Sequence, residues 1–168
     1  MNKSQFTDLM KVWIESYLQN KYGKSYHVSV VIPTSNISRL PRTEIKDCVT
    51  NYSSFEFSPD IIGILKHKTL TNKVELVFLN RSMASISLKE IGEMQCYCRI
   101  ADPLEAFIVS SKGLPQEINM LLLDDVISTS LLKYSSNKFI NVFTWNATKG
   151  DIEPLSIFPL GSNFIKGC

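Results

Sequence analysis

The sequence predicts an α/β domain in which a mixed central β-sheet is flanked by helices. Three observations predict it: helical apolar spacing near the N-terminus, short β-branched segments typical of strands, and the alternation of both patterns along the chain. Of the 168 residues, 44% are hydrophobic and 20% are charged, which is enough apolar material for a core and argues against disorder. We therefore expect residues 1–168 to form a single domain.

The N-terminal third predicts a helix, a strand and a long connection. Apolar residues recur at three- and four-residue spacing over 4–21, which predicts an amphipathic helix. Residues 26–32 are rich in valine and isoleucine and end at a proline, so we expect a strand there. Residues 33–54 contain many Pro, Ser and Asn residues and predict a long connection, with a short helix over 43–49.

The central part predicts two antiparallel strands followed by a helix. The strands are expected over 55–65 and 74–81, and the polar, basic segment 66–73 is expected to be the hairpin between them. Ser87 and Glu90 have the spacing of a capping box, so they predict the start of a helix over 87–100.

The C-terminal part predicts a further alternation of strands and helices. Residues 106–110 are nearly all apolar, as in a strand at the centre of a sheet that is covered on both faces. Residues 115–134 predict a helix in two pieces. Strands are expected over 139–145 and 152–158, with a turn over 146–151.

Charge and cysteine content restrict the class of protein. The net charge of +2 permits nucleic-acid binding without implying it. No apolar run approaches the roughly 20 residues of a membrane span, and no signal peptide is visible, so we expect a cytoplasmic protein without membrane contact. The four cysteines form no CxxC pair and the two histidines are isolated, which favours reduced cysteines over a zinc site.

The two central strands carry a pattern typical of metal-dependent nucleases. Asp60 follows Pro59 at the first strand, and the second strand ends in Arg81. A divalent metal beside a scissile phosphate needs carboxylate ligands, and side chains two residues apart on a strand face the same way. A second carboxylate is therefore expected two residues before the cation, but Leu79 occupies that position.

Residues 57–113 resemble the PD-(D/E)XK nuclease superfamily, which has the restriction-endonuclease-like fold. The resemblance rests on Ser58 to Leu65, the strand over 74–81, the helix with Gln95 and Tyr97, and the strand that ends at Ser110 before Gly113. It implies a restriction-endonuclease-like core, a magnesium ion and DNA as the partner. Leu79 and Arg81 replace the glutamate and lysine of the family pattern.

The resemblance implies that a carboxylate on the helix can replace the missing one. Asp60 and Glu93 are then the predicted magnesium ligands, and Arg81 or Lys89 stabilises the developing phosphate charge. Glu56 is a weaker candidate ligand. The opposing interpretation is that Glu93 and Lys89, four residues apart, form an exposed ion pair.

Four basic residues are candidate phosphate contacts: Arg39 and Arg42 in the long connection, and Lys66 and Lys68 at the hairpin. The opposing interpretation places them in solvated loops. Three functions remain open: a magnesium-dependent endonuclease, a catalytically degenerate DNA-binding version of it, and a protein–protein assembly module of a larger complex with no nucleic-acid role. We expect DNA as a partner, and a homodimer or a partner subunit as a further one, since nucleases that cut both strands are often symmetric dimers.

Overall fold

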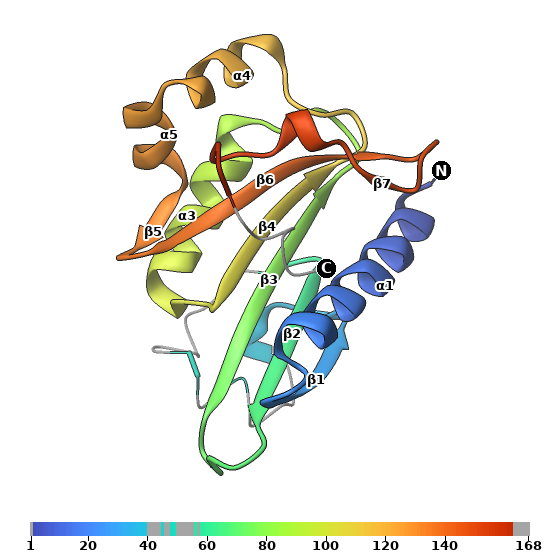
Figure 1. Ribbon diagram of the computed structural model, residues 1–168, viewed down its shortest axis with the longest axis vertical. Helices are drawn as coiled ribbons and strands as arrows, with labels where there is room; N and C mark the ends of the chain where they lie inside the picture. Colours follow the sequence, from blue (N-terminus) through green and yellow to red (C-terminus); the bar gives the residue numbers. More distant parts are fainter. Residues whose placement is uncertain (1, 40–44, 46–47, 50–55, 57, 163–168) are drawn as a thin grey trace. The chain divides into compact units, whose positions relative to one another are not determined.

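The computed structural model of the chain describes residues 2–39, 45, 48, 49, 56 and 58–162. It is an α/β structure with a mixed seven-stranded sheet and four α-helices in the described residues, as the sequence predicts (Figure 1). The chain divides into two units, with the boundary between Leu79 and Asn80 inside strand β3 (Val74–Ser82). We describe each unit separately.

The first unit consists of helix α1 (Lys3–Tyr22) packed on strands β1 (Tyr26–Val31), β2 (Ile61–His67) and the first part of β3. The three strands pair antiparallel in sequence order. Figure 1 shows α1 lying along β1 and β2. Four apolar side chains of α1 are fully buried: Phe6, Met10, Ile14 and Leu18.

Gly63 explains how closely α1 approaches the sheet. It pairs with Val77 of β3, and a Cβ atom at Gly63 would lie 2.6 Å from Leu18 Cδ1. Side chains alternate between the two faces of a strand, so Val77 and Leu79 lie on the face that α1 covers. Leu76 and Phe78 point to the opposite face and are also buried, so this part of the sheet is covered on both sides.

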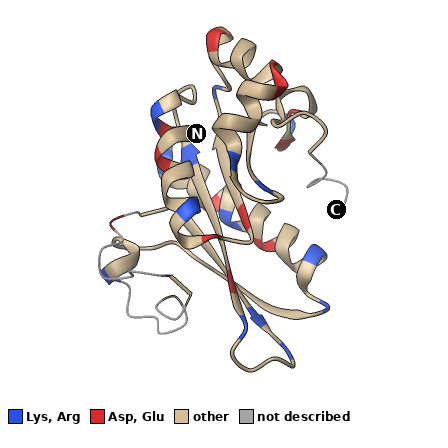
Figure 2. Ribbon diagram, turned by 90° about the vertical axis from the view of Figure 1, so that its left-hand side faces the viewer, with Lys and Arg blue, Asp and Glu red and all other residues tan. Residues whose placement is uncertain are grey.

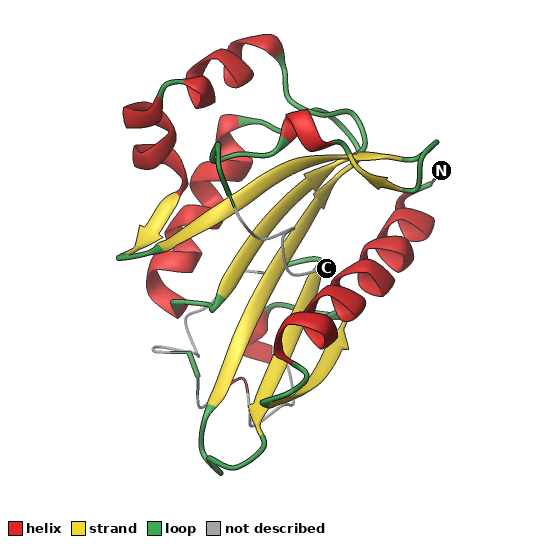
Figure 3. Ribbon diagram, in the orientation of Figure 1, coloured by secondary structure: helices red, strands yellow, loops and turns green. Residues whose placement is uncertain are grey.

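The second unit contains strand β4 (Glu105–Ser110), which is entirely buried and pairs in parallel with β6 (Lys138–Asn146). Figure 3 shows these two strands side by side, with helix α3 (Leu88–Ala101) next to them. The short strands β5 (Lys133–Ser135) and β7 (Asp151–Ile152) pair antiparallel with β6. The unit also contains helices α4 (Gln116–Leu123) and α5 (Asp125–Leu132) and the 3-10 helix η3 (Pro154–Ser156).

The predicted start of α3 is confirmed in detail. The Ser87 hydroxyl accepts a hydrogen bond from Glu90 N at 3.3 Å, and Ser87 N donates to Glu90 Oε2 at 2.8 Å. The predicted break in the helical segment 115–134 is also confirmed, since α4 ends at Leu123 and Asp124 caps α5.

Three predicted boundaries are wrong. The strand expected over 55–65 begins only at Ile61, because Pro59 has no N–H for a strand ladder and Asp60 forms a bend; Glu56 therefore lies outside it. Lys133 and Tyr134 belong to β5 and not to a helix. The strand expected over 152–158 is interrupted and leaves β7 and an isolated antiparallel bridge between Phe158 and Val142, because Pro154 opens a 3-10 turn in which Ser156 Oγ accepts the hydrogen bond of Thr144 N at 2.8 Å.

The short helix predicted over 43–49 lies mostly outside the described residues. In the described part of the chain, no helix has the length and the apolar character that crossing a membrane requires.

Candidate nucleic-acid interface

The turn between β2 and β3, residues 68–73, is fixed against the end of α1. Lys68 N donates to Ser25 O at 2.9 Å, which ties the turn to the residues that follow α1. Inside the turn, His67 N donates to Lys73 O at 3.0 Å, and the His67 Nδ1 atom accepts from Leu70 N at 3.1 Å. Because His67 forms hydrogen bonds with residues in both halves of the turn, the turn has a defined shape.

Five exposed lysines belong to the end of α1, to the residue after Gly23 and to the hairpin, and we call them the basic end: Lys21, Lys24, Lys66, Lys68 and Lys73. The side chain of Lys66 points to the opposite face of β2 from that of His67. Figure 2 shows basic positions on both strands of the hairpin. Glu75 contacts this set, with its Oε1 atom 3.8 Å from Lys73 Nζ. The five lysines give the basic end its positive charge.

Aromatic rings connect the lysines of α1 with those of the hairpin. Tyr22 and Tyr26 meet edge to face with ring centroids 6.1 Å apart, and Tyr26 meets His67 in the same way at 5.0 Å. The Lys21 ammonium lies 5.3 Å from the Tyr22 ring centroid, and the Lys73 ammonium lies 6.0 Å from that of Tyr26. These contacts hold lysines from two separate segments in one cluster.

Lys73 keeps its charge at neutral pH. The hydrogen bond with the Tyr26 side chain and the charge of that side chain, with a smaller effect of Glu75, raise the pKa of Lys73 above its ordinary value. A raised lysine pKa means that the ammonium form is the one present near pH 7.

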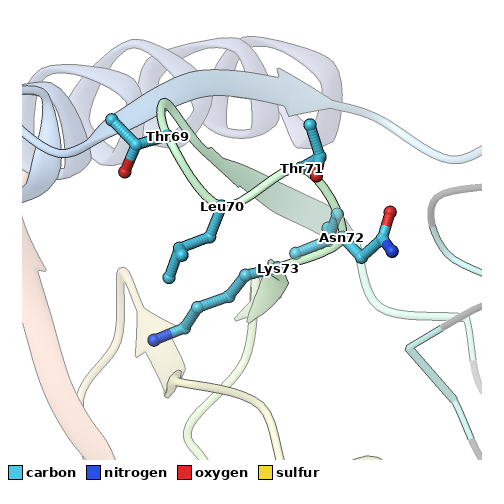
Figure 4. Close-up of a pocket in the computed structure, with 6 residues that line it drawn as sticks. Thr69, Leu70, Thr71, Asn72 and Lys73 are labelled. Carbon is cyan, nitrogen blue, oxygen red and sulfur yellow. The ribbon is translucent and has the colours of Figure 1, made fainter.

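An open pocket of about 560 Å³ lies on the turn and is lined by Thr69 to Val74. Figure 4 shows Leu70 and Lys73 extending side by side, with Thr69, Thr71 and Asn72 around them. The two hydroxyls, the amide and the ammonium are all hydrogen-bond donors. Exposed donors beside a cation are suited to phosphate oxygens.

Of the four predicted phosphate contacts, two belong to the basic end and two do not. Lys66 and Lys68 belong to the basic end, but Lys68 Nζ also donates to Gly23 O at 2.6 Å and so caps the end of α1. Arg39 is exposed at the end of the 3-10 helix η1 (Ile37–Arg39), and Arg42 lies outside the described residues. The predicted contacts do not include Lys21, Lys24 and Lys73, although Lys21 and Lys24 lie on either side of the Gly23 that ends α1.

The predicted catalytic residues are divided between the two units. Asp60 belongs to the first unit, where it is half-buried in the bend before β2. Arg81, Lys89 and Glu93 belong to the second unit: Arg81 is half-buried near the end of β3, and Lys89 and Glu93 are exposed on α3. The structure thus does not bring these residues together in one unit. No group of three or more His, Cys, Asp or Glu side chains that could hold a metal occurs among the described residues.

Leu79 is a core residue. It pairs with Ile61 across the β2–β3 ladder, and both side chains are 0% exposed on the face that α1 covers. The position where the family pattern places a carboxylate is therefore enclosed by apolar groups.

Two other residues that carry the resemblance have structural roles. The Gln95 Nε2 atom donates to Ser130 O at 2.7 Å, close to the end of α5. Ser110 is fully buried; its hydroxyl donates to Ala84 O at 2.7 Å and accepts from Gly113 N at 3.0 Å. Gly113 has a φ of +76°, a conformation that favours glycine, so Ser110 and Gly113 together shape the loop after β4.

No family model, curated protein or solved structure matches this chain.

Proposed function

We propose that the protein is a DNA-binding domain with a nuclease-like arrangement of elements, and that its basic end contacts the phosphates of a duplex. The observation that carries the proposal is the exposure of the five lysines of the basic end beside a turn of defined shape. The order β2, β3, α3, β4 supports the nuclease-like description, because it is the order of the elements that carry the PD-(D/E)XK resemblance.

The charge of the basic end suits a regular array of phosphates. Duplex DNA carries one negative charge per about 1.7 Å of helix axis, so several lysines on one surface can each neutralise a phosphate. Such contacts position a protein on DNA without reading its sequence. We therefore expect binding that depends strongly on salt and weakly on base sequence.

The non-catalytic version of the nuclease hypothesis is favoured by the position of Leu79. A strand carboxylate beside Asp60 would complete a magnesium site, but the expected position lies in the apolar core. In the active alternative, Asp60 and Glu93 would hold Mg²⁺ and Arg81 or Lys89 would stabilise the phosphate charge. Asp60 belongs to the first unit and Glu93 to the second.

The test is DNA binding by fluorescence anisotropy over a range of salt concentrations. We expect Lys66→Ala to weaken binding and to lower the slope of log K against log salt by about 0.9, the value for one lost phosphate contact. Lys112→Ala removes an exposed lysine of the second unit and serves as the matched control, with no change in the slope. Failure of the wild-type protein to bind DNA at low salt would contradict the proposal.

Magnesium separates the two versions of the proposal. The non-catalytic version predicts the same affinity with Mg²⁺ and with EDTA at matched ionic strength, and no cleavage of plasmid or linear DNA. Cleavage that requires Mg²⁺ and disappears in Asp60→Ala would establish the active alternative instead.

A further inference from the structure

Helices α4 and α5 each expose large apolar side chains, and we call these residues together the α4–α5 surface. Its members are Met120, Leu123, Val126 and Ile127, whose side chains are 64%, 51%, 80% and 37% exposed. Met120 and Leu123 are three residues apart on α4 and are neighbours on its exposed side, whereas Val126 and Ile127 belong to the first turn of α5, after the break at Asp124. Large apolar side chains that gather on one surface are typical of interaction sites.

The helices are anchored so that these residues face outward. Ile118 and Leu122 of α4, and Ser128 and Leu132 of α5, form the buried side. The Asp124 carboxylate accepts hydrogen bonds from Val126 N at 2.9 Å and Ile127 N at 3.0 Å, which starts α5 at a fixed angle to α4. The exposed residues are therefore held in place by the fold and do not belong to a loose loop.

The charged side chains of these two helices have one sign. Between Lys112 and Lys133 the chain contains no Lys, Arg or His, and its three carboxylates, Glu117, Asp124 and Asp125, are all exposed. Figure 2 shows acidic positions on the two helices, which Figure 1 places at the upper end of the second unit. The surface thus combines an apolar centre with an acidic border.

We propose that the α4–α5 surface binds a basic amphipathic helix of a partner protein. The apolar face of such a helix would cover Met120, Leu123 and Val126, and its lysines or arginines would meet the three carboxylates. The same charges disfavour the other occupants. DNA and anionic membranes would be repelled, and a second copy placed on the same surface about a two-fold axis would bring like charges together.

The probe is a synthetic helical peptide with leucines at i, i+3, i+4 and i+7 and with lysines on the remaining surface. One control peptide has the same composition with the leucines distributed around the helix, and a second has glutamate in place of lysine. Isothermal titration calorimetry with the full chain is expected to show binding of the basic amphipathic peptide, and binding at least about tenfold weaker for both controls.

The surface is tested with Met120→Ser combined with Val126→Ser. We expect this double variant to keep the wild-type circular dichroism spectrum and to bind the probe at least about tenfold more weakly. Val12→Ser removes an exposed apolar side chain from α1 and is the matched control, with unchanged binding. Asp125→Asn is expected to reduce the salt dependence of binding.

Four results would overturn the proposal: no binding of the probe, equal binding of the control peptides, full binding by the double variant, or binding to phosphatidylglycerol vesicles that the double variant loses. A fifth result that would overturn it comes from sedimentation: a wild-type dimer that becomes a monomer in the double variant would show that a second copy occupies the surface.

Discussion

At the scale of single residues, Leu79 is a core residue at the position where the PD-(D/E)XK pattern, which the sequence resembles, has a metal-binding carboxylate. The residue is enclosed between Ile61 on the neighbouring strand and the helix that covers the sheet. A carboxylate at this position would have to lose its water shell without a partner, which costs several kcal/mol. A leucine at this position therefore stabilises the apolar core of the unit, but its side chain cannot bind a metal ion.

Placing a carboxylate at position 79, as in the PD-(D/E)XK pattern that the sequence resembles, is therefore expected to destabilise the protein and not to activate it. Leu79→Glu should lower the free energy of unfolding by about 3 kcal/mol or more, because the buried charge has no partner. Leu79→Met, which conserves volume and polarity, should cost less than about 1.5 kcal/mol. Urea unfolding measures both. A Leu79→Glu protein of wild-type stability that gains magnesium-dependent cleavage would show that the position opens to the solvent.

Cys98 provides a second residue-scale prediction, this time in pH. Burial, and then the charge of Asp102, raise the pKa of the Cys98 thiol well above its ordinary range, against the opposing charge of Lys138. Below pH about 8.5 the thiol is protonated in both the folded and the unfolded chain, so its contribution to stability is complete there. Above that pH the unfolded chain releases the proton and the folded chain retains it, so stability falls by up to about 1.4 kcal/mol per pH unit.

The measurement is the difference in unfolding free energy between the wild type and Cys98→Ala from pH 7 to pH 10. The difference should be constant up to pH about 8.5 and should then shrink as pH rises. Cys96→Ala, which alters an exposed thiol on the same helix, should show no such trend. A constant difference over the whole range would mean that Cys98 ionises equally in both states.

At the scale of elements, local signals predicted the helices better than the ends of the strands. The capping box at Ser87 and the apolar spacing of α1 are both contained within a few residues, and both elements form where they were expected. The end of β7 depends instead on a distant partner, since Ser156 takes the hydrogen bond of Thr144 that a longer strand would use. No sequence pattern within 152–158 indicates that the Ser156 side chain, and not the backbone of a longer strand, accepts this hydrogen bond.

The capping box predicts a measurable contribution to stability. Ser87→Ala removes the acceptor of Glu90 N and should lower the free energy of unfolding by about 1 kcal/mol. Ser85→Ala changes an exposed serine two residues earlier and should stay within about 0.5 kcal/mol of the wild type. Equal stabilities of the two variants would show that the hydroxyl of Ser87 does not hold the start of α3.

At the scale of the whole molecule, the two functions that we propose divide along the chain by charge. Residues 1–79 contain ten Lys and Arg against seven Asp and Glu, a net of +3, whereas residues 80–168 contain eight against nine, a net of −1. A total charge of +2 hides this difference. The sequence placed basic residues at the hairpin, but it could not show that lysines near the end of α1 join them, because those contacts arise only when the turn folds against Ser25.

The division predicts that the two binding activities can be removed independently. Lys24→Ala with Lys66→Ala should weaken DNA binding, since two phosphate contacts are lost, and should leave the affinity for the basic amphipathic peptide unchanged. Met120→Ser with Val126→Ser should have the opposite effect. Anisotropy with labelled DNA and calorimetry with the peptide, performed on both double variants at one salt concentration, give the four affinities. Loss of both activities in either double variant, with the fold intact by circular dichroism, would mean that one surface serves both ligands and that the division by charge does not govern binding.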